Sequence, residues 1–212
     1  MELYEAMSTL RAVRRLRPDP IPEDVLERVF QAATWAPTGG NHQGWRLIAV
    51  REAALKQGLE DLYRPHWQSY IPGYEAHMAS MPEEARASSA KALAAGTYLS
   101  THLHEAPVIA VFCFNPERLT ITDAALDRPS VVGGGSIYPA VQNLLLACRN
   151  EGLGCVLTTL LCMEEEKVKA LLKIPEGWYT AAHVPIGYAV GGGHGPISRK
   201  PTTEMVSWDR FS

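Results

Sequence analysis

The sequence has few cysteines, no long hydrophobic run and no large excess of charge of one sign. Its four cysteines form no C-x-x-C pair, which favours buried free thiols over disulfides or a zinc site. The longest apolar run, residues 106–114, is far shorter than the roughly 20 residues that a membrane helix needs. The formal net charge of −3 points to neither nucleic acid nor an anionic membrane.

Signals for targeting and for several common active sites are also missing. The first fifteen residues carry acidic and polar side chains where a signal peptide would be apolar, so we expect a cytoplasmic protein. No phosphate loop of the G-x-x-x-x-G-K-[ST] kind and no G-x-S-x-G elbow occurs. The glycine runs at 133–135 and 191–193 do not match G-x-G-x-x-G, and we interpret both as turns.

A metal site is not expected either. His102 and His104 are two residues apart, a spacing that points their rings to different faces of a helix. No second cluster of ligands completes a set around them.

The composition is that of an ordinary globular chain. Of 212 residues, 46% are hydrophobic and 20% are charged, enough to bury a full core within one domain. We therefore expect a single domain spanning residues 1–212.

The order of expected elements favours one fold class. Hydrophobic periodicity predicts helices at 2–10, from 22 to near 37, over most of 51–106, at 137–149 and at 164–172, with strands at 45–50, 108–114, 155–161 and 182–190. Helices and strands do not alternate one for one, which disfavours a doubly wound nucleotide fold. The pattern instead indicates a mixed sheet covered by helices on both faces.

An aromatic insert interrupts the long helical block. Pro65 and Pro82 predict irregular backbone over about 63–82, and this stretch carries Tyr63, Trp67, Tyr70 and Tyr74. These side chains could form a lid over an active site, or they could simply pack beneath a long excursion of the chain.

Basic side chains near both ends of the chain suggest an anion site. Arg11 and Arg14 lie three apart at a helix end, and Arg199 and Lys200 follow a glycine-rich turn. Guanidinium groups suit a phosphate because they bind it with paired hydrogen bonds. On charge alone, a solvated basic face is the alternative.

Several motifs, in order along nearly the whole chain, resemble those of the flavin-dependent nitroreductase family. R-A-V-R-R-L at 11–16 resembles the family's R-S-x-R-x-F, and A-P-T-G-G-N-H-Q-G-W-R at 36–46 resembles A-P-S-x-x-N-x-Q-P-W-R. Further matches are N-L-L-L-A at 143–147, G-L-G at 152–154, I-P-E-G at 174–177, I-G-Y at 186–188 and R-K-P at 199–201. One such match alone would be weak evidence for the resemblance, but together the matches are strong evidence.

The resemblance implies an α+β fold: a mixed, mainly antiparallel sheet sandwiched between helices, in an intertwined homodimer with FMN at each of two interfaces. In such a dimer the tail at 191–212 would reach the partner subunit. The residues that the resemblance assigns to FMN are Arg11, Ala12, Arg14, Pro37, Thr38, Gly39, Asn41, Gln43, Thr158, Thr159, Leu160 and Arg199.

The same resemblance divides these residues by role. Arg11, Arg14 and Arg199 would hold the phosphate, with only the backbone N–H of Ala12 serving where the family usually has serine. The loop from Pro37 to Asn41, with Gln43 a further contact, would reach the flavin from the partner chain. The backbone N–H of Thr159 would meet flavin N5 as the catalytic group.

Two further residues of the loop bear on the resemblance. Gly44 stands where the family has proline. His42 also lies in this loop, and a purely structural role is one interpretation of it.

The resemblance therefore implies ping-pong hydride transfer from NAD(P)H, NADPH included, to a small nitroaromatic, quinone or similar acceptor. One alternative is a specialised activity of the same family, such as flavin fragmentation or reductive dehalogenation. Another is a flavin-binding protein without catalysis.

Overall fold

The computed structural model describes residues 1–211. In chain order its helices and strands are α1 (Leu3–Thr9), β1 (Leu16–Arg17), α2 (Glu23–Thr34), β2 (Trp45–Val50), α3 (Ala53–Ala79), α4 (Glu83–Ser100), β3 (Val108–Phe114), α5 (Tyr138–Asn150), β4 (Gly154–Cys155), α6 (Glu165–Leu172), β5 (Tyr179–Ala189) and α7 (Thr202–Met205). Short 3₁₀ turns occur at Gly39–Asn41, Leu103–Glu105, Pro116–Arg118, Val132–Ser136 and Leu160–Glu164.

The strands form one sheet in the order β1-β5-β3-β2, with β4 also paired to β5. Every named pairing within residues 1–211 is antiparallel, so the sheet is more uniform than the mixed sheet expected. β5 is the long central strand, and its consecutive residues Ala182, His183 and Val184 are all fully buried, although successive side chains point to opposite faces of a sheet. Both of its faces must therefore be covered.

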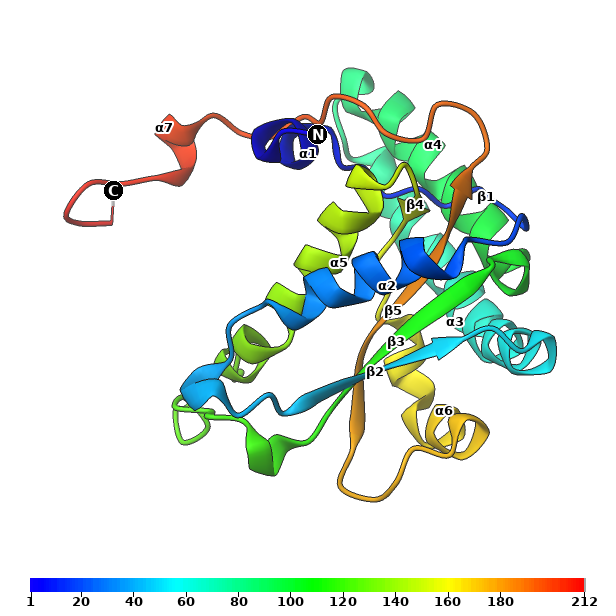
Figure 1. The fold of residues 1–212 in the computed structure, drawn as a ribbon. Helices are drawn as coiled ribbons and strands as arrows, with labels where there is room; N and C mark the ends of the chain where they lie inside the picture. Colours follow the sequence, from blue (N-terminus) through cyan, green and yellow to red (C-terminus); the bar gives the residue numbers. More distant parts are fainter. Residues whose placement is uncertain (212) are drawn as a thin grey trace.

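Helices cover the two faces of the sheet, as Figure 1 shows. One core lies between the sheet and α2 with α5, around residues such as Val29, Phe112 and Leu144. The other lies between the sheet and α3, around residues such as Leu59 and Val111. This arrangement confirms the expected α+β sandwich.

The expected irregular insert at 63–82 is wrong, because α3 runs through both Pro65 and Pro72 and ends only at Ala79. A proline inside a helix costs about 3 kcal/mol, so tertiary contacts must offset it. The Trp67 Nε1 donates to Thr97 Oγ1 of α4 at 3.2 Å. The Trp67 ring packs so closely on α4 that a β-carbon at Gly96 would overlap it. A lid role for the aromatic side chains stays a prediction.

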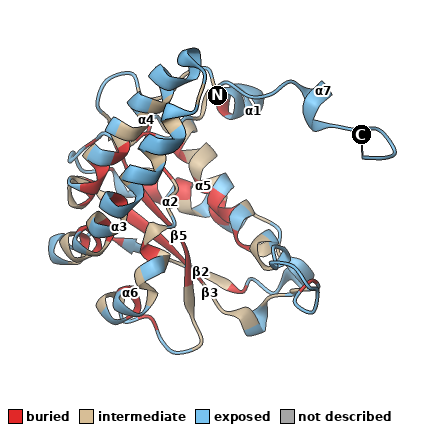
Figure 2. Ribbon diagram, turned by 180° about the vertical axis from the view of Figure 1, so that it is seen from behind, coloured by how far each residue is buried: buried red, intermediate tan, exposed pale blue. Residues whose placement is uncertain are grey.

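The later strand boundaries also differ from the expected ones. Where a strand was expected over 155–161, the structure has only the two-residue strand Gly154–Cys155. An isolated bridge between Thr158 and His183 follows it. β5 begins at Tyr179, before the expected residue 182. The glycine run at 191–193 forms a bend rather than the expected turn, and the chain then passes α1 and continues as an arm that extends away from the body, as Figure 2 shows.

Among residues 1–211, no helix combines the length and the apolar character that a membrane crossing requires. His102 and His104 lie in separate surroundings. The ring of His102 stacks on Tyr98 at 3.8 Å between centroids, whereas His104 Nδ1 lies 2.6 Å from the buried carboxylate of Glu60.

Candidate functional site

The arginines singled out in the sequence come together in one pocket. Arg11, Ala12, Arg14 and Arg199 all line a cavity of about 290 Å³, which we call the arginine pocket. The first three follow α1, whereas Arg199 comes from the C-terminal arm. Residues almost two hundred positions apart therefore form a single cationic site.

His194 fixes the root of the arm against this pocket. Its Nδ1 accepts a hydrogen bond from the backbone N–H of Arg11 at 3.3 Å, and its Nε2 donates to the carbonyl of Leu153 at 2.8 Å. The side chain of Arg11 also donates to the carbonyl of Pro196. Sequence reasoning missed His194, because only the fold brings these segments together.

Arg14 keeps its donors available for a ligand. In the chain up to residue 211, no hydrogen bond or ion pair uses its guanidinium group, whereas Arg199 Nη1 donates to the carbonyl of Ser198 at 2.8 Å. Arg14 also lines the neighbouring cavity. It is therefore the cation at the junction of two pockets.

This second cavity, the aromatic pocket, measures about 280 Å³ and shares Arg14, Val156 and Leu157 with the arginine pocket. Its other lining residues are Tyr63, Trp67, Tyr70, Leu99, Thr158, Thr159 and Leu160. Burial raises the pKa of Tyr63, while the Thr158 side chain and the Arg14 charge lower it, so the hydroxyl stays neutral near pH 7. Together the two pockets form a depression with one cationic and one largely apolar end.

The backbone of Thr159 offers an unused donor at the edge of this depression. Thr158 and His183 exchange two backbone hydrogen bonds of 2.9 Å, and the carbonyl of Thr159 accepts from Cys162 N at 2.9 Å. None of the hydrogen bonds within residues 1–211 uses the Thr159 N–H, and the residue is exposed. A fixed segment thus presents a free donor to a ligand.

Behind this segment, His183 is fully buried on β5. Both of its ring nitrogens lack a hydrogen-bond partner among the described residues. Burial lowers the pKa of His183 to about 4, so the ring is neutral at pH 7. It has no access to the depression and contributes packing there, not charge.

The loop at residues 37–43 has an unusual backbone. Gly40, Asn41 and Gln43 have φ angles of 56°, 54° and 49°, a region that costs free energy for residues other than glycine. Hydrogen bonds hold the shape: Gln43 N donates to Thr38 Oγ1 at 3.0 Å, and Gly39 N donates to Ser136 Oγ at 3.0 Å. Ser136 is a second residue that sequence reasoning missed.

This loop does not meet the arginine pocket within one chain. The twelve residues of α2 separate the two, a length of about 18 Å at 1.5 Å per residue. In Figure 1 the segment after α2 lies at the far end of α2 and α5 from α1. The expected site residues therefore form two groups.

The structure explains one departure from the resembling motif. A β-carbon at Gly44 would lie 2.7 Å from the carbonyl oxygen of Arg118. The Gly44 carbonyl accepts a hydrogen bond from Asn115 N at 2.9 Å, which holds the loop against this neighbouring segment. A proline here would require this segment to move.

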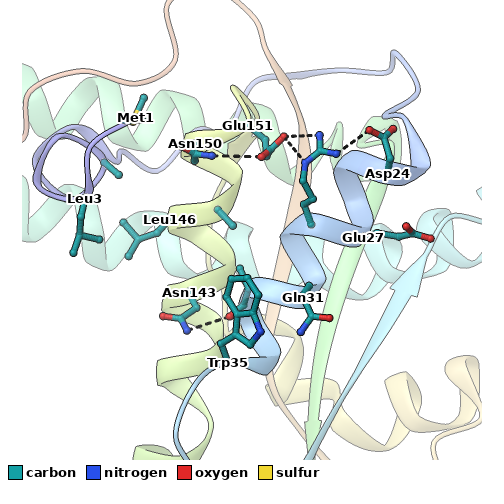
Figure 3. A pocket seen from close by; sticks show the side chains of 14 residues that line it. Met1, Leu3, Asp24, Glu27, Gln31, Trp35, Asn143, Leu146, Asn150 and Glu151 are labelled. Atoms are coloured by element: carbon teal, nitrogen blue, oxygen red, sulfur yellow. Dashed lines mark hydrogen bonds and ion pairs between the residues drawn. The ribbon is translucent and has the colours of Figure 1, made fainter.

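A larger cavity lies elsewhere, in a groove of about 810 Å³ between α1, α2 and α5. Figure 3 shows Trp35, Leu3 and Leu146 along it. Arg28 bridges Asp24 and Glu151 at 2.8 Å each at one end. The groove shares no lining residue with the arginine or aromatic pocket, so its size does not make it the site of chemistry.

Comparison with known proteins adds a family and a fold. The model of the Nitroreductase family matches residues 9–188. An NADH dehydrogenase of Thermus thermophilus is 30% identical, covering 93% of this chain and 91% of its own. A 5,6-dimethylbenzimidazole synthase of Rhodospirillum rubrum is also 30% identical, covering 84% and 77%.

Solved structures agree on the fold. An oxidised iodotyrosine deiodinase bound to FMN and 3-iodo-L-tyrosine superposes with a TM-score of 0.69 and 24% identity. The alignment covers 99% of this chain and 100% of that one.

Proposed function

The chain belongs to the nitroreductase family, and from that premise we propose that it is an FMN-dependent NAD(P)H oxidoreductase. It would pass hydride through flavin N5 to a nitroaromatic, a quinone or a similar small acceptor. The observation that carries the proposal is the unpaired Thr159 N–H at the edge of a depression whose other end is cationic.

The pocket residues fit FMN in charge and in shape. Arg11, Arg14 and Arg199 would hold the phosphate dianion, for which guanidinium groups supply paired charge-assisted hydrogen bonds. The aromatic pocket would take the edge of a flat, largely apolar ring. When bound, the flavin supplies the redox chemistry, and the protein supplies position and electrostatics.

Thr159 would contribute through its backbone alone. Its N–H is fixed by the Thr158–His183 bridge, so a donor aimed at developing negative charge needs no reorganisation during the reaction. Neighbouring Tyr63 stays neutral because burial raises its pKa. No acid–base side chain is required by this arrangement.

The two separated groups of site residues support a homodimer. The loop with Pro37, Thr38, Gly39, Asn41 and Gln43 would complete the site of a second copy. The arm at 191–212 would reach the same partner, because its Trp208 is 88% exposed and its Phe211 fully exposed. Such apolar side chains lower their free energy by packing against another surface.

Two measurements test the proposal. The purified protein should show the visible absorption of bound flavin, and it should oxidise NADH or NADPH steadily once menadione is added. A coloured protein without turnover is a flavin binder and contradicts the enzymatic part. A protein that takes up no FMN contradicts the whole proposal.

A second candidate is flavin fragmentation, since one relative is named 5,6-dimethylbenzimidazole synthase. The protein is supplied with reduced flavin and oxygen, and the products are analysed by mass spectrometry. This measurement distinguishes flavin fragmentation from the oxidoreductase activity. Release of 5,6-dimethylbenzimidazole would favour this candidate, and recovery of intact FMN would favour the oxidoreductase.

A further inference from the structure

One segment, residues 115–136, packs against the loop at 37–43, and we call this segment the brace loop. The two lie side by side beyond the end of α2, as Figure 1 shows. The Gly39 N–H donates to Ser136 Oγ at 3.0 Å, and a β-carbon at Gly39 would lie 3.4 Å from Thr120 Cβ. Gly39 is therefore held between two parts of the brace loop, and its N–H is used within the chain.

The loop at 37–43 needs support from outside because its backbone is strained. Asn41 and Gln43 have φ angles of 54° and 49°, and residues with a side chain keep such angles only where their surroundings fix them. The brace loop supplies contacts at both ends, at Gly39 and at Gly44, whose carbonyl accepts from Asn115 N. The shape of the strained loop therefore depends on the shape of the brace loop.

The buried carboxylate of Asp123 closes the brace loop on itself. Its Oδ1 accepts from Ser130 Oγ at 2.7 Å, and its Oδ2 accepts from Val131 N at 2.9 Å and from Arg128 Nη1 at 2.8 Å. The bonds from Ser130 and Val131, together with that from Arg128, lower the pKa of Asp123 to about 2. The carboxylate is therefore charged at neutral pH, and both of its oxygens are occupied by donors.

From this carboxylate, a compact run of residues leads to Ser136. Gly134 N donates to the carbonyl of Val131 at 3.2 Å. A β-carbon at Gly133 would lie 3.3 Å from Ile121 Cδ1, so the two sides of the brace loop pack closely here because residue 133 has no side chain. The position that the carboxylate gives to Val131 is thus passed on to Ser136, five residues later.

We propose that Asp123 is a positioning residue for FMN: through Ser136 it holds the loop at 37–43 in the shape that completes the site of a second copy. Asp123 lines neither the arginine pocket nor the aromatic pocket, so it acts without touching the cofactor. The inference rests on the proposed function and adds to it a residue of one subunit that acts on the FMN of the other.

The first test measures FMN affinity by titration of the full-length apo protein. Asp123→Asn keeps the size of the side chain, but an amide has one acceptor oxygen where the carboxylate has two. The matched control is Asp127→Asn, on the same loop at an exposed residue. Asp123→Asn should raise the FMN dissociation constant about tenfold, as expected for loss of one hydrogen bond, and Asp127→Asn should leave it unchanged.

The route through Ser136 is tested by a second substitution. Ser136→Ala removes the acceptor of the Gly39 N–H and should also weaken FMN, whereas Ser136→Thr keeps a hydroxyl and should restore most of the affinity. The double variant Asp123→Asn with Ser136→Ala should be no weaker than the weaker single variant, because residues that act in one chain of contacts are not additive. Hydrogen exchange of peptides covering the loop at 37–43 should be faster in both single variants and unchanged in Asp127→Asn.

A mixed dimer tests whether Asp123 acts on the other subunit. One subunit carries Arg14→Ala, which weakens the phosphate site, and the other carries Asp123→Asn; two affinity tags select the mixed species. If the loop serves the opposite site, one site of this dimer receives both defects and the other receives neither. Half of the sites should then bind FMN as tightly as the wild-type protein does, although both parent variants bind it weakly.

Several results would overturn the inference. These are unchanged FMN affinity in Asp123→Asn, an equal effect of Asp127→Asn, additive effects in the double variant, and a mixed dimer without any tight site. If the wild-type protein still binds FMN and oxidises NAD(P)H in such a case, the proposed function stands and only the role of Asp123 is wrong. A wild-type protein that takes up no FMN overturns both.

Discussion

At the scale of single residues, His183, which lies behind the proposed site, makes the stability of the fold depend on pH. Its pKa of about 4 in the folded chain lies below the ordinary value of 6.5. Between these two values the unfolded chain binds a proton and the folded chain does not, so the free energy of unfolding falls as the pH falls from 6.5 to 4. The full effect is about 3 kcal/mol at 1.36 kcal/mol for each pKa unit.

We expect His183→Leu to remove this part of the acid sensitivity. The substitution breaks no hydrogen bond, because both ring nitrogens are unpaired within the described chain. Urea unfolding of both proteins at pH 7, 5.5 and 4.5 measures the difference. Parallel loss of stability in the two proteins would show that His183 titrates normally.

Arg199 should contribute more to the affinity for FMN than to the stability of the fold. Arg199→Ala should weaken FMN about ten- to hundredfold, as expected for loss of one charge-assisted hydrogen bond. Lys200→Ala is the matched control, because Lys200 pairs with Glu204 of the arm at 3.4 Å and lies outside the arginine pocket. Flavin titration of the apo protein decides, and equal effects of the two substitutions would place the phosphate elsewhere.

The role of the Thr159 backbone can be separated from that of its side chain. Thr159→Ala keeps the N–H and should keep most of the rate of flavin reduction by NAD(P)H. Thr159→Pro removes the N–H and should lose that rate. Stopped-flow bleaching of the flavin band measures it, with FMN retention checked first. Loss of reduction in the alanine variant, or its survival in an FMN-loaded proline variant, would refute the assignment.

At the scale of helices and strands, agreement with the sequence depends on what decides each element. β2 and β3 have the bounds that were expected, since short β-branched and aromatic runs on a buried sheet follow local pattern. α3 does not, because Pro65 and Pro72 are local signals that packing against α4 overrides. No local pattern reveals that Gly96 makes room for Trp67.

That contact gives a matched pair of helix substitutions. Gly96→Ala forces the Trp67 ring out of place and should destabilise the chain by about 1–3 kcal/mol. Gly73→Ala, in α3 with nothing within 4 Å of the added β-carbon, should stabilise it by about 0.5–1 kcal/mol through helix propensity. Urea unfolding compares them. A neutral Gly96→Ala would mean that the two helices are free to separate.

At the scale of the whole molecule, the motifs implied both the candidate residues and their two groups, but not the contacts that bring one group together. Arg11 and Arg199 share a pocket only because the arm root returns to α1, where Gly195 N and Ile197 N donate to the carbonyls of Thr9 and Ser8. Contacts of such long sequence separation leave no periodic signal. His194 and Ser136 were missed for the same reason.

The two groups of site residues lead to the last prediction, on the arm. A chain that ends at Pro201 keeps Arg199 but loses Trp208 and Phe211. If the arm packs on a second copy, the loss of two large apolar side chains, about 1.5–3 kcal/mol each, should raise the dimer dissociation constant more than about a hundredfold. Sedimentation velocity over a dilution series of the FMN-loaded proteins measures it.

The full-length variant Trp208→Ala with Phe211→Ala controls for the missing backbone of the arm and should show the same weakening. The full chain should sediment at twice its chain mass at low micromolar concentration, because each site needs the loop at Pro37–Asn41 of the other copy. FMN should then be lost from the shortened chain on dilution, although every arginine of the pocket is still present. A shortened chain that dimerises as tightly as the full one would rule out the arm as part of the interface, and a monomer that retains FMN would rule out the shared site.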